Sequence, residues 1–406
     1  MSKERLIAAI DIGSSKIATI IASVTEERLS VIGVSTVPSR GIRKGVVVDI
    51  DNAVSAISKS LEAAERMAGC SVSQVLACVG GSHIESLNSH GVVAVSRPGS
   101  EIVAEDVTRV TEAAQAVSLP SNREIIHVIP RDFIVDSQDG IHEPVGMSGV
   151  RLEVETNIIS GSATALHNLA KCVEQVGVSI SDFVYSGLAS AESILTETEK
   201  ELGTVLVDIG GGTTSMIIYI EGSPVFSSVL PMGGQNITND LAIGLGTSLE
   251  NAEKVKLKLS SALKEDVDIN VKELGIEGTE IIPKKYLTSI IRFRLDELFS
   301  IVSLEIKKSG FSGKLPAGVV LSGGAARTHE IEQAAKMVLK LPVRVGSPRG
   351  VVGLIDEITG PAYSSGIGAL LYGQSLDLSR ESGNGAKNKV VNIFVKVREW
   401  IKSFLP

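Results

Sequence analysis

Many apolar residues occur in short runs separated by turn residues, a pattern typical of strands. In some stretches between these runs, the apolar residues recur with helical spacing. Residues 5–24 predict a strand, a Gly/Ser turn and a second strand. Further strands are predicted at 31–37, 46–50 and 75–80. Residues 51–67 predict a helix, with Asp51 as the expected N-cap. The beginning of the chain is therefore expected to form an α/β unit.

The pattern of predicted elements changes between residues 84 and 157. Strand-like runs surround one helical stretch over 105–117. This content predicts a small α+β module set between two α/β halves. After it, a helix is predicted over 162–176, then a strand over 182–187 and a helix from residue 189.

The opening pattern returns in the second half of the chain. Residues 203–220 again predict strand, Gly-rich turn and strand, so DIGSSK (11–16) has a counterpart in DIGGGTT (208–214). Internal duplication is the simplest explanation. The remaining predictions are helices at 246–264, 286–308, 364–373 and 388–405, a strand at 318–321 and a linker at 376–387.

Composition sets the limits of the functional interpretation. The chain has 406 residues, 43% of them apolar, and a formal net charge of −8. This supports buried cores and excludes a disordered or disulfide-stapled chain. The acidic balance argues against a nucleic-acid-binding protein. Cys70, Cys78 and Cys172 lack metal-ligand spacing and are interpreted as inert thiols of a reducing cytosol, and no signal peptide is expected at the N-terminus.

The two DIG turns are the strongest chemical signal. In each, an aspartate, Asp11 or Asp208, ends an apolar strand, and the glycines that follow let backbone N–H groups form an anion nest. Lys16 adds a positive charge. Two such turns facing each other would hold a polyphosphate, with both aspartates directed at a Mg²⁺ ion. A lone turn is most often an ordinary hairpin, but two copies and Gly323-Gly324 after a third strand favour a nucleotide site.

These motifs resemble those of a known superfamily. DIGSSK, DIGGGTT and LSGGAA (321–326) are similar to the phosphate-1, phosphate-2 and adenosine motifs of the actin-like ATPases, in the same order. The resemblance implies an α/β, actin-like (ribonuclease H-like) fold whose two halves close on ATP and Mg²⁺, with the metal held through water at Asp11 and Asp208. The nucleotide-binding residues it implies are Asp11, Gly13, Ser14, Ser15, Lys16, Asp208, Gly210, Gly211, Gly212, Thr213, Thr214, Glu253, Lys256, Gly323, Gly324 and Ala325.

The inserted module narrows the family. IIHVIPRDFIVDSQDGIHEPVGMSGVRLEVE (125–155) resembles subdomain 1C of the FtsA family of bacterial cell-division proteins, most specifically in PVGMSGVRLEVE (144–155). The division it implies is 1A at 1–83 and 158–196, 1C at 84–157, 2A at 197–230 and 304–361, 2B at 231–303, a closing 1A helix at 362–375, a linker at 376–387 and a membrane-targeting amphipathic helix at 388–406.

The last helix is amphipathic at about 100° per residue. The helix has a net charge of +3, because it contains four basic residues and one acidic residue. The basic residues are Lys389, Lys396, Arg398 and Lys402, and the acidic residue is Glu399. This charge excludes a membrane span and is typical of a helix lying in the membrane surface. The alternative is a terminal helix packed on the protein's own core. Two features favour membrane binding: a linker separates this helix from the fold, and FtsA-like proteins end in a membrane-targeting helix. The residues expected to enter the membrane are Ile393, Phe394, Val397, Trp400, Ile401, Phe404 and Leu405.

The stretch YSGLASAESIL (185–195) lacks the residue that positions water for hydrolysis in related ATPases. Chaperone-type ATPases have Glu-Pro where this chain has Ser186-Gly187, and Glu192 is interpreted as a surface residue. ATP binding with slow or absent hydrolysis is therefore expected, because the rate depends on that group.

The resemblance also implies partners. The helix at 290–308 is similar to the FtsA segment that receives the C-terminal peptide of the tubulin-like protein FtsZ, and Arg294 and Glu297 match charged positions there. A solvated helix face is the alternative. Filaments of the protein itself, later division proteins on 1C and an anionic membrane surface are further expected partners, and nucleic acid is not. The expected location is the cytoplasmic face of the inner membrane at the division site.

Two other functions remain open. An actin-fold kinase acting on a small molecule needs a catalytic base, for which there is no candidate, and leaves the terminal helix unexplained. A pilus-assembly adaptor of the same fold usually lacks such a tail. The scattered histidines are interpreted as structural or surface residues: His83, His90, His127, His142, His167 and His329.

Overall fold

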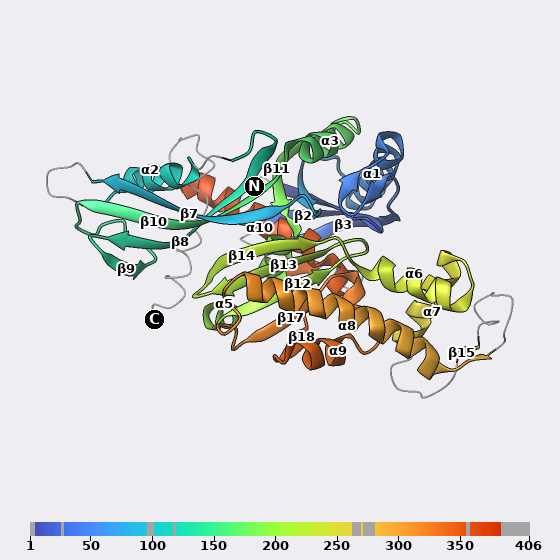
Figure 1. Ribbon diagram of the computed structural model, residues 1–406. Coiled ribbons are helices and arrows are strands. Elements are labelled where there is room, and N and C mark those ends of the chain that lie inside the picture. Colours follow the sequence, from blue (N-terminus) through green and yellow to red (C-terminus); the bar gives the residue numbers. More distant parts are fainter. Residues whose placement is uncertain are drawn as a thin grey trace.

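The computed structural model describes residues 5–25, 28–95, 101–116, 119–261, 269–270, 281–354 and 358–382. Figure 1 shows an elongated molecule, with the inserted module at one end and α6, α7 and the beginning of α8 at the other. The predicted terminal helix, all its membrane residues included, lies outside the described residues. Among the helices that are described, none is long and apolar enough to cross a membrane.

The first half is built on a six-stranded sheet. Its strands, in spatial order, are β11 (Ser179–Tyr185), β6 (Gln74–Val79), β1 (Arg5–Ile12), β2 (Lys16–Thr25), β3 (Arg28–Pro38) and β19 (Val351–Gly353). The strand pairs β1–β2 and β2–β3 are antiparallel, whereas β6 runs parallel to β1. Asp11 therefore sits at the end of β1 between Ala18 of β2 and Cys78 of β6.

The second half repeats this arrangement, which confirms the predicted duplication. Its strands are β18 (Val343–Val345), β17 (Gly318–Ser322), β12 (Thr204–Ile209), β13 (Thr214–Ile220) and β14 (Ser223–Leu230). Here β12 pairs antiparallel with β13 and parallel with β17, as β1 does with β2 and β6. Asp208 lies between Ser215 and Ser322, the position that corresponds to Asp11.

The inserted module adds four strands to this second sheet. They are β7 (Glu85–Ala94), β10 (Arg151–Ser162), β8 (Arg123–Val135) and β9 (Gln138–Ile141), with α2 (Ala104–Gln115) packed against them. The module has its own core, which includes Ile102, Val107 and Phe133. One bridge, Ser228 to Glu85, joins it to β14, so a single nine-stranded sheet runs through both.

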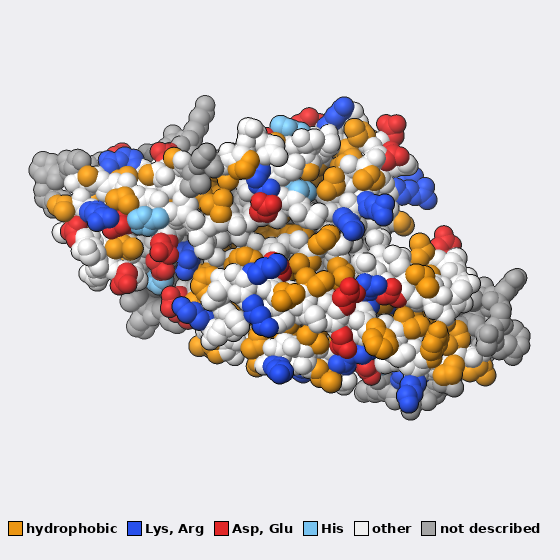
Figure 2. Space-filling model, viewed as in Figure 1, with side chains coloured by type: hydrophobic (Ala, Val, Ile, Leu, Met, Phe, Trp, Pro, Cys, Tyr) orange, Lys and Arg blue, Asp and Glu red, His pale blue; other side chains and the backbone are white. Residues whose placement is uncertain are grey.

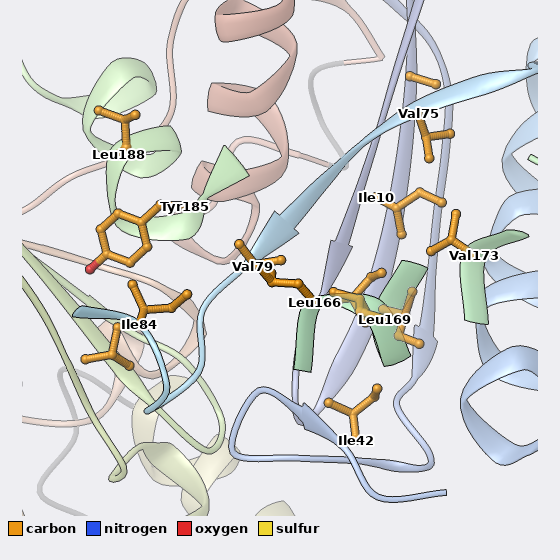
Figure 3. Close-up of a cluster of buried hydrophobic side chains, with 14 of the residues drawn as sticks. Ile10, Ile42, Val75, Val79, Ile84, Leu166, Leu169, Val173, Tyr185 and Leu188 are labelled. Carbon is orange, nitrogen blue, oxygen red and sulfur yellow. The ribbon is translucent and has the colours of Figure 1, made fainter. Parts of the chain in front are cut away.

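Two helices, α4 (Ser186–Ile194) and α10 (Ser364–Ser382), pack against each other between the halves, with α4 on β12 and β13 and α10 on β1 and β6. They cross closely because small residues meet: a Cβ on Gly368 would lie 1.6 Å from the Ala189 carbonyl oxygen. The outer helices of the first half are α1 (Ile50–Ala68) and α3 (Ala163–Glu174), beside the short hairpin of β4 (Ile42–Arg43) and β5 (Val46–Val47). Figure 3 shows side chains of β1, β6, α3 and α4 gathered in one apolar cluster.

The second half carries the other helices. They are α5 (Glu197–Leu202), α6 (Gly234–Leu245), α7 (Leu249–Ser261), α8 (Lys284–Lys308) and α9 (Ile331–Leu339), with the 3-10 turns η2 (Gly324–Arg327) and η3 (Pro361–Tyr363) and the short strands β15 (Ile269–Asn270) and β16 (Ile281–Ile282). The buried face of α8, with Leu295 and Phe299, packs on the core of this half.

Several predicted boundaries were wrong. The helix expected at 246–264 is α7, which begins at Leu249, because Gly246 adopts a left-handed conformation (φ 59°) and ends a separate helix, α6, that was not predicted. The helix expected from 51 begins at Ile50, and its N-cap is Asp49, whose side chain accepts a hydrogen bond from the Asn52 amide. This also ends the strand expected at 46–50 after Val47.

Two more corrections concern segments late in the chain. The linker expected at 376–387 begins as helix, because α10 continues to Ser382; no glycine interrupts the sequence between Gly373 and Gly383, and Leu376 is buried. The stretch 304–361 was assigned whole to the second half, but its β19 pairs with β3 of the first half. Pattern alone cannot choose which sheet edge a three-residue strand joins.

Candidate functional site

The two glycine turns meet where the halves face each other. A Cβ on Gly211 would lie 2.6 Å from the Ser15 side chain, and one on Gly212 would lie 2.9 Å from that of Ser14. Glycine is therefore required at both positions, because the backbones approach too closely for a side chain. The structure brings the predicted phosphate-1 and phosphate-2 residues into direct contact.

The same internal bond closes both turns. The Gly13 amide donates to the Lys16 carbonyl at 3.0 Å, and the Gly210 amide donates to the Thr213 carbonyl at 2.9 Å. Neighbouring loops hold their hydroxyls: Ser14 Oγ accepts from the Gly45 amide at 3.0 Å, and Thr213 Oγ1 donates to the Gly80 carbonyl at 3.1 Å. Gly45 and Gly80 are thus parts of the site that the sequence did not indicate.

The two aspartates lie beneath the turns, and each bonds a serine of a connecting helix. Ser365 Oγ of α10 donates to Asp11 at 2.8 Å, and Ser190 Oγ of α4 donates to Asp208. Burial raises the pKa of Asp208 to about 7, against the opposing effect of the Ser190 hydrogen bond. Burial also raises the pKa of Asp11, which Lys16 counteracts. A cation between these carboxylates would stabilise their charged forms.

Lys16 supplies positive charge at the junction. Its Nζ donates to the Ala362 carbonyl at 2.5 Å and lies 3.9 Å from the centre of the Tyr363 ring. Burial lowers the pKa of this lysine, while Asp11 and Asp208 act in the opposite direction. A bound polyanion would act in the same direction as those aspartates and favour the charged lysine.

The third predicted motif borders the phosphate-2 turn. Gly323 has φ +84°, and a Cβ there would lie 2.4 Å from Asp208 Oδ1. Beside Gly324 the space is open, with the Ala362 Cβ 3.8 Å from a Cβ placed there. The motif therefore packs its first glycine on the aspartate and leaves the backbone of the second accessible.

The predicted ribose and adenine pair forms a compact ionic cluster. Lys256 Nζ lies 2.7 Å from Glu253 Oε2 and 2.8 Å from Thr238 Oγ1, and it also donates to the Gly234 carbonyl at 3.3 Å. The Gly234 amide in turn donates to the carbonyl of Gly210 at 2.9 Å. The cluster therefore connects α7, which carries Glu253 and Lys256, to the beginning of α6, and the beginning of α6 is in turn bonded to the phosphate-2 turn.

These residues fit a magnesium nucleotide. Bare glycine backbone lines both turns, a lysine lies between them, and two carboxylates whose burial disfavours their charge lie below. Oxygen ligands of this kind suit Mg²⁺. Phosphates would lie between the turns at Ser14, Ser15, Gly211 and Gly212, and the nucleoside would lie toward Glu253, Lys256 and Gly324.

The connecting helix α4 provides no carboxylate at the turns. Ser186 faces Gly80, where a Cβ would lie 2.9 Å from the Ser186 hydroxyl. Glu192 is not the surface residue that was expected: its side chain is 18% exposed and lies 3.8 Å from Lys200 of α5. It borders a cavity that none of the turn residues lines.

The sequence pattern does not indicate Ser190 and Ser365 as residues of the site. They occur in helices rich in small residues, and nothing in the local pattern distinguishes them from their neighbours Ser193 and Ser364. Only the crossing of α4 and α10 under the turns places their hydroxyls on the aspartates.

The expected partner residues lie on α8, remote from the turns. Arg294 forms two hydrogen bonds to Asp240 of α6, at 2.5 and 2.8 Å, and a third to Glu297 at 2.5 Å. Exposed apolar side chains occur on the same helices, with Phe293 78% and Ile243 81% exposed. Figure 2 shows apolar side chains gathered over this end of the molecule, beside acidic and basic ones.

Two family models match the chain. The model described as cell division protein FtsA matches residues 205–368, and the SHS2 domain inserted in FtsA matches residues 81–160. The second range agrees closely with the inserted module.

Curated relatives extend the match over nearly the whole chain. The cell division protein FtsA of Pseudomonas aeruginosa is 38% identical over 410 residues, covering 98% of this chain and 98% of that protein. The protein of the same name from Bacillus subtilis is 42% identical, and the match covers 92% of this chain and 84% of that protein. The Escherichia coli K12 protein is 34% identical, and the match covers 98% of this chain and 96% of that protein.

Solved structures show the fold at low identity. The PilM–PilN type IV pilus biogenesis complex has a chain with TM-score 0.65 and 15% identity, covering 91% of this chain and 98% of that one. MreB5 of Spiroplasma citri bound to ADP has TM-score 0.56 and 13% identity, and the match covers 93% of this chain and 99% of that one. The fold is actin-like.

Proposed function

The chain belongs to the FtsA family of cell division proteins, and from this premise we propose that it is an ATP-binding adaptor that polymerises, tethers FtsZ filaments to the cytoplasmic membrane and recruits later division proteins. The observation that carries the nucleotide part is the meeting of both glycine turns over Asp11 and Asp208. MreB5 of Spiroplasma citri, which shares the fold, has been solved both with ADP and with AMPPNP bound.

Nucleotide occupancy sets the spacing of the halves in this proposal. Gly211 and Gly212 lie so close to Ser15 and Ser14 that even an added Cβ would clash, so phosphates would enter only if the turns separate. When bound, ATP supplies a chain of negative charge that both turns contact. Lys16, whose Nζ donates to the Ala362 carbonyl, would be the residue that binds a phosphate oxygen. The two serines of α4 and α10 orient the carboxylates that would hold the metal.

We expect slow or absent ATP hydrolysis because α4 places no carboxylate at the turns. Within residues 185–195 the one carboxylate is Glu192, which is engaged near Lys200. With no carboxylate of this helix at the turns to orient water, the chemical step lacks a positioning group. ATP serves in this proposal as a ligand that fixes the pose of the two halves and favours filament assembly.

The other contacts are proposed for separate surfaces. The exposed apolar side chains near Arg294 and Glu297 suit the C-terminal peptide of FtsZ. The inserted module, at the opposite end of the molecule, is free to meet later division proteins or a neighbouring subunit (Figure 1). The segment 388–406 attaches the filament to the inner face of the membrane.

Asp208→Ala tests the nucleotide site. We expect ATP affinity, measured with a fluorescent analogue and Mg²⁺, to fall by about tenfold or more, since an interaction with a charged group contributes roughly 1.5–3 kcal/mol. Burial already disfavours the charged carboxylate, so its removal is not expected to lower the melting temperature. Asp51→Ala on the exposed start of α1 is the control. Full retention of ATP by a folded Asp208→Ala variant would show that the site is assigned wrongly.

A further inference from the structure

A cavity of about 730 Å³ lies where the inserted module meets both halves, away from the glycine turns. Its walls come from β8, β11, α4, α5, β13 and α10. This volume is in the range of sites that bind drug-sized ligands or a few large side chains. None of the nucleotide-site residues borders it.

The inner wall of the cavity is apolar. Ile126, Phe183 and Tyr372 are half-buried and pack against an apolar core that both halves share, and Leu188 and Tyr219 are buried members of that core. His127 adds to this wall as a neutral group, because burial lowers its pKa to about 3. The wall therefore suits aromatic or aliphatic side chains.

The lining is acidic around this wall. Arg131 and Lys200 are its two permanent cations, and both are paired: Arg131 lies 3.3 Å from Glu155, and Lys200 lies 3.0 Å from Glu197. Its six carboxylates are those of Glu124, Asp182, Glu192, Glu197, Glu201 and Glu221. A phosphate-bearing ligand would be repelled, whereas a cationic amphipathic segment matches both the apolar wall and the charge.

We propose that this cavity binds the C-terminal segment 388–406 of the same chain, which hides its apolar face when no membrane is present. The segment has net charge +3 and carries Phe394 and Trp400 on its apolar side. The proposal rests on the membrane role of that segment, to which it adds a second, competing binding place.

The connection to the cavity is short. Leu376 of α10 lines the cavity, and the helix continues for six residues to Ser382, a rise of about 9 Å. The next six residues can span up to about 20 Å when extended, so residue 388 can return to the cavity. A short tether of this kind gives an effective concentration on the order of millimolar, so weak contacts suffice.

Docking in cis would make membrane attachment conditional. The cavity holds only a few large side chains, so the docked state is weak and a membrane surface displaces it. Filament formation presents many tails to one surface and shifts the competition further toward lipid through avidity. A single subunit in solution would keep its tail covered.

Trp400, the single tryptophan of the chain, reports on this state directly. The full-length protein is studied without lipid at a concentration at which sedimentation shows a monomer. We expect blue-shifted Trp400 emission and protection from acrylamide, compared with a free peptide of residues 388–406. Emission and quenching equal to those of the free peptide would overturn the proposal. Protection that rises with protein concentration would also overturn it, because it indicates a tail bound to a second copy.

Charge reversal tests the site. Glu201 and Glu221 are exposed, and the variant Glu201→Lys/Glu221→Lys should lower the docked fraction by about tenfold, because two attractive exposed charge pairs are replaced by repulsive ones. The control Asp51→Lys/Glu62→Lys reverses two exposed acids of α1 and should leave Trp400 protected. Adding Lys396→Glu/Lys402→Glu to the cavity variant should restore protection. Lack of any difference between the two acid variants would reject the cavity as the binding place.

Anionic liposomes separate this inference from the membrane proposal. If both are correct, the cavity variant binds lipid more tightly than the wild-type monomer. If Trp400 is protected without lipid and unchanged with it, docking is correct and the membrane role is wrong. If Trp400 is exposed without lipid and shielded with it, the membrane role is correct and docking is wrong.

Discussion

His127 joins three parts of the molecule at one buried ring. Its Nε2 accepts a hydrogen bond from the Tyr185 amide at 3.0 Å, and its Nδ1 lies 3.4 Å from the Tyr372 hydroxyl. The rings of His127 and Tyr372 are edge to face, with centres 5.5 Å apart. The inserted strand β8 is thereby bonded to β11 and α10 through a histidine that must stay neutral to accept from the amide.

Protonation of His127 should destabilise the fold. Burial lowers its pKa to about 3 from an ordinary 6.5, so below pH 6.5 the unfolded chain takes up a proton that the folded chain does not. This contribution to stability is complete above pH 6.5 and is lost as the pH falls toward 3. The loss amounts to about 2 kcal/mol at pH 5.

Urea unfolding at pH 7.5 and pH 5 measures this effect. His127→Gln keeps an acceptor without a titrating group, so its stability should fall less between the two pH values than that of the wild type. The control His167→Gln removes an exposed histidine that pairs with Glu124 and should leave the wild-type pH dependence in place. Equal pH dependence of His127→Gln and the wild type would contradict the prediction.

At the scale of single elements, α8 shows that a charged position can be both structural and available. Arg294 bonds Asp240 across the contact of α8 with α6, and its guanidinium is not simply a solvated surface charge. Phe293, the residue before it, is 78% exposed. A peptide that binds here would contact apolar surface and an arginine already oriented by two carboxylates.

Arg294→Glu should weaken binding of an FtsZ C-terminal peptide by about tenfold or more, because it removes the cation and places a third carboxylate beside Asp240 and Glu297. Fluorescence anisotropy with a labelled peptide measures this. Arg292→Glu is the matched control: Arg292 pairs with Asp296 within α8 at 2.7 Å, and the same charge change there should leave affinity within about twofold. Unchanged binding by Arg294→Glu would remove this site from the proposal.

At the scale of the whole molecule, the connecting helices join the nucleotide site to the packing of the halves. Ser190 on α4 bonds the aspartate of the second half, and Ser365 on α10 bonds that of the first half. The crossing of these helices at Gly368 leaves no room for a side chain. In the proposed function, a separation of the turns would therefore move α4 and α10 together.

In the proposed function, membrane attachment depends on the assembly of many chains into a filament. Phe394→Gln should reduce flotation with anionic liposomes by about tenfold or more, since burying such a side chain contributes roughly 1.5–3 kcal/mol. Ser403→Gln introduces the same residue on the polar face and should float as the wild type does. Conditions that favour filaments should increase flotation of the wild type, because many weak tails act together. Normal flotation of a chain lacking 388–406 would contradict the membrane proposal.

Local pattern was sufficient where the physical cause is local. The duplicated strand, turn and strand follow from apolar runs and from glycines that two tight turns require, and the inserted module follows from a change in that pattern. Asp11, Lys16, Asp208 and Gly323 could be selected from the sequence because each lies at a strand end or in a turn.

The tertiary structure alone decided what depends on residues far apart in the chain. Ser365 and Asp11 are 354 positions apart, and Arg294 and Asp240 are 54 apart, so no periodicity records either bond. The acidic cavity likewise exists only because β8, α5 and α10 meet. Repeating patterns determine elements and their turns through local sterics and burial, whereas the pairing of side chains is determined by packing, which the order of residues does not display.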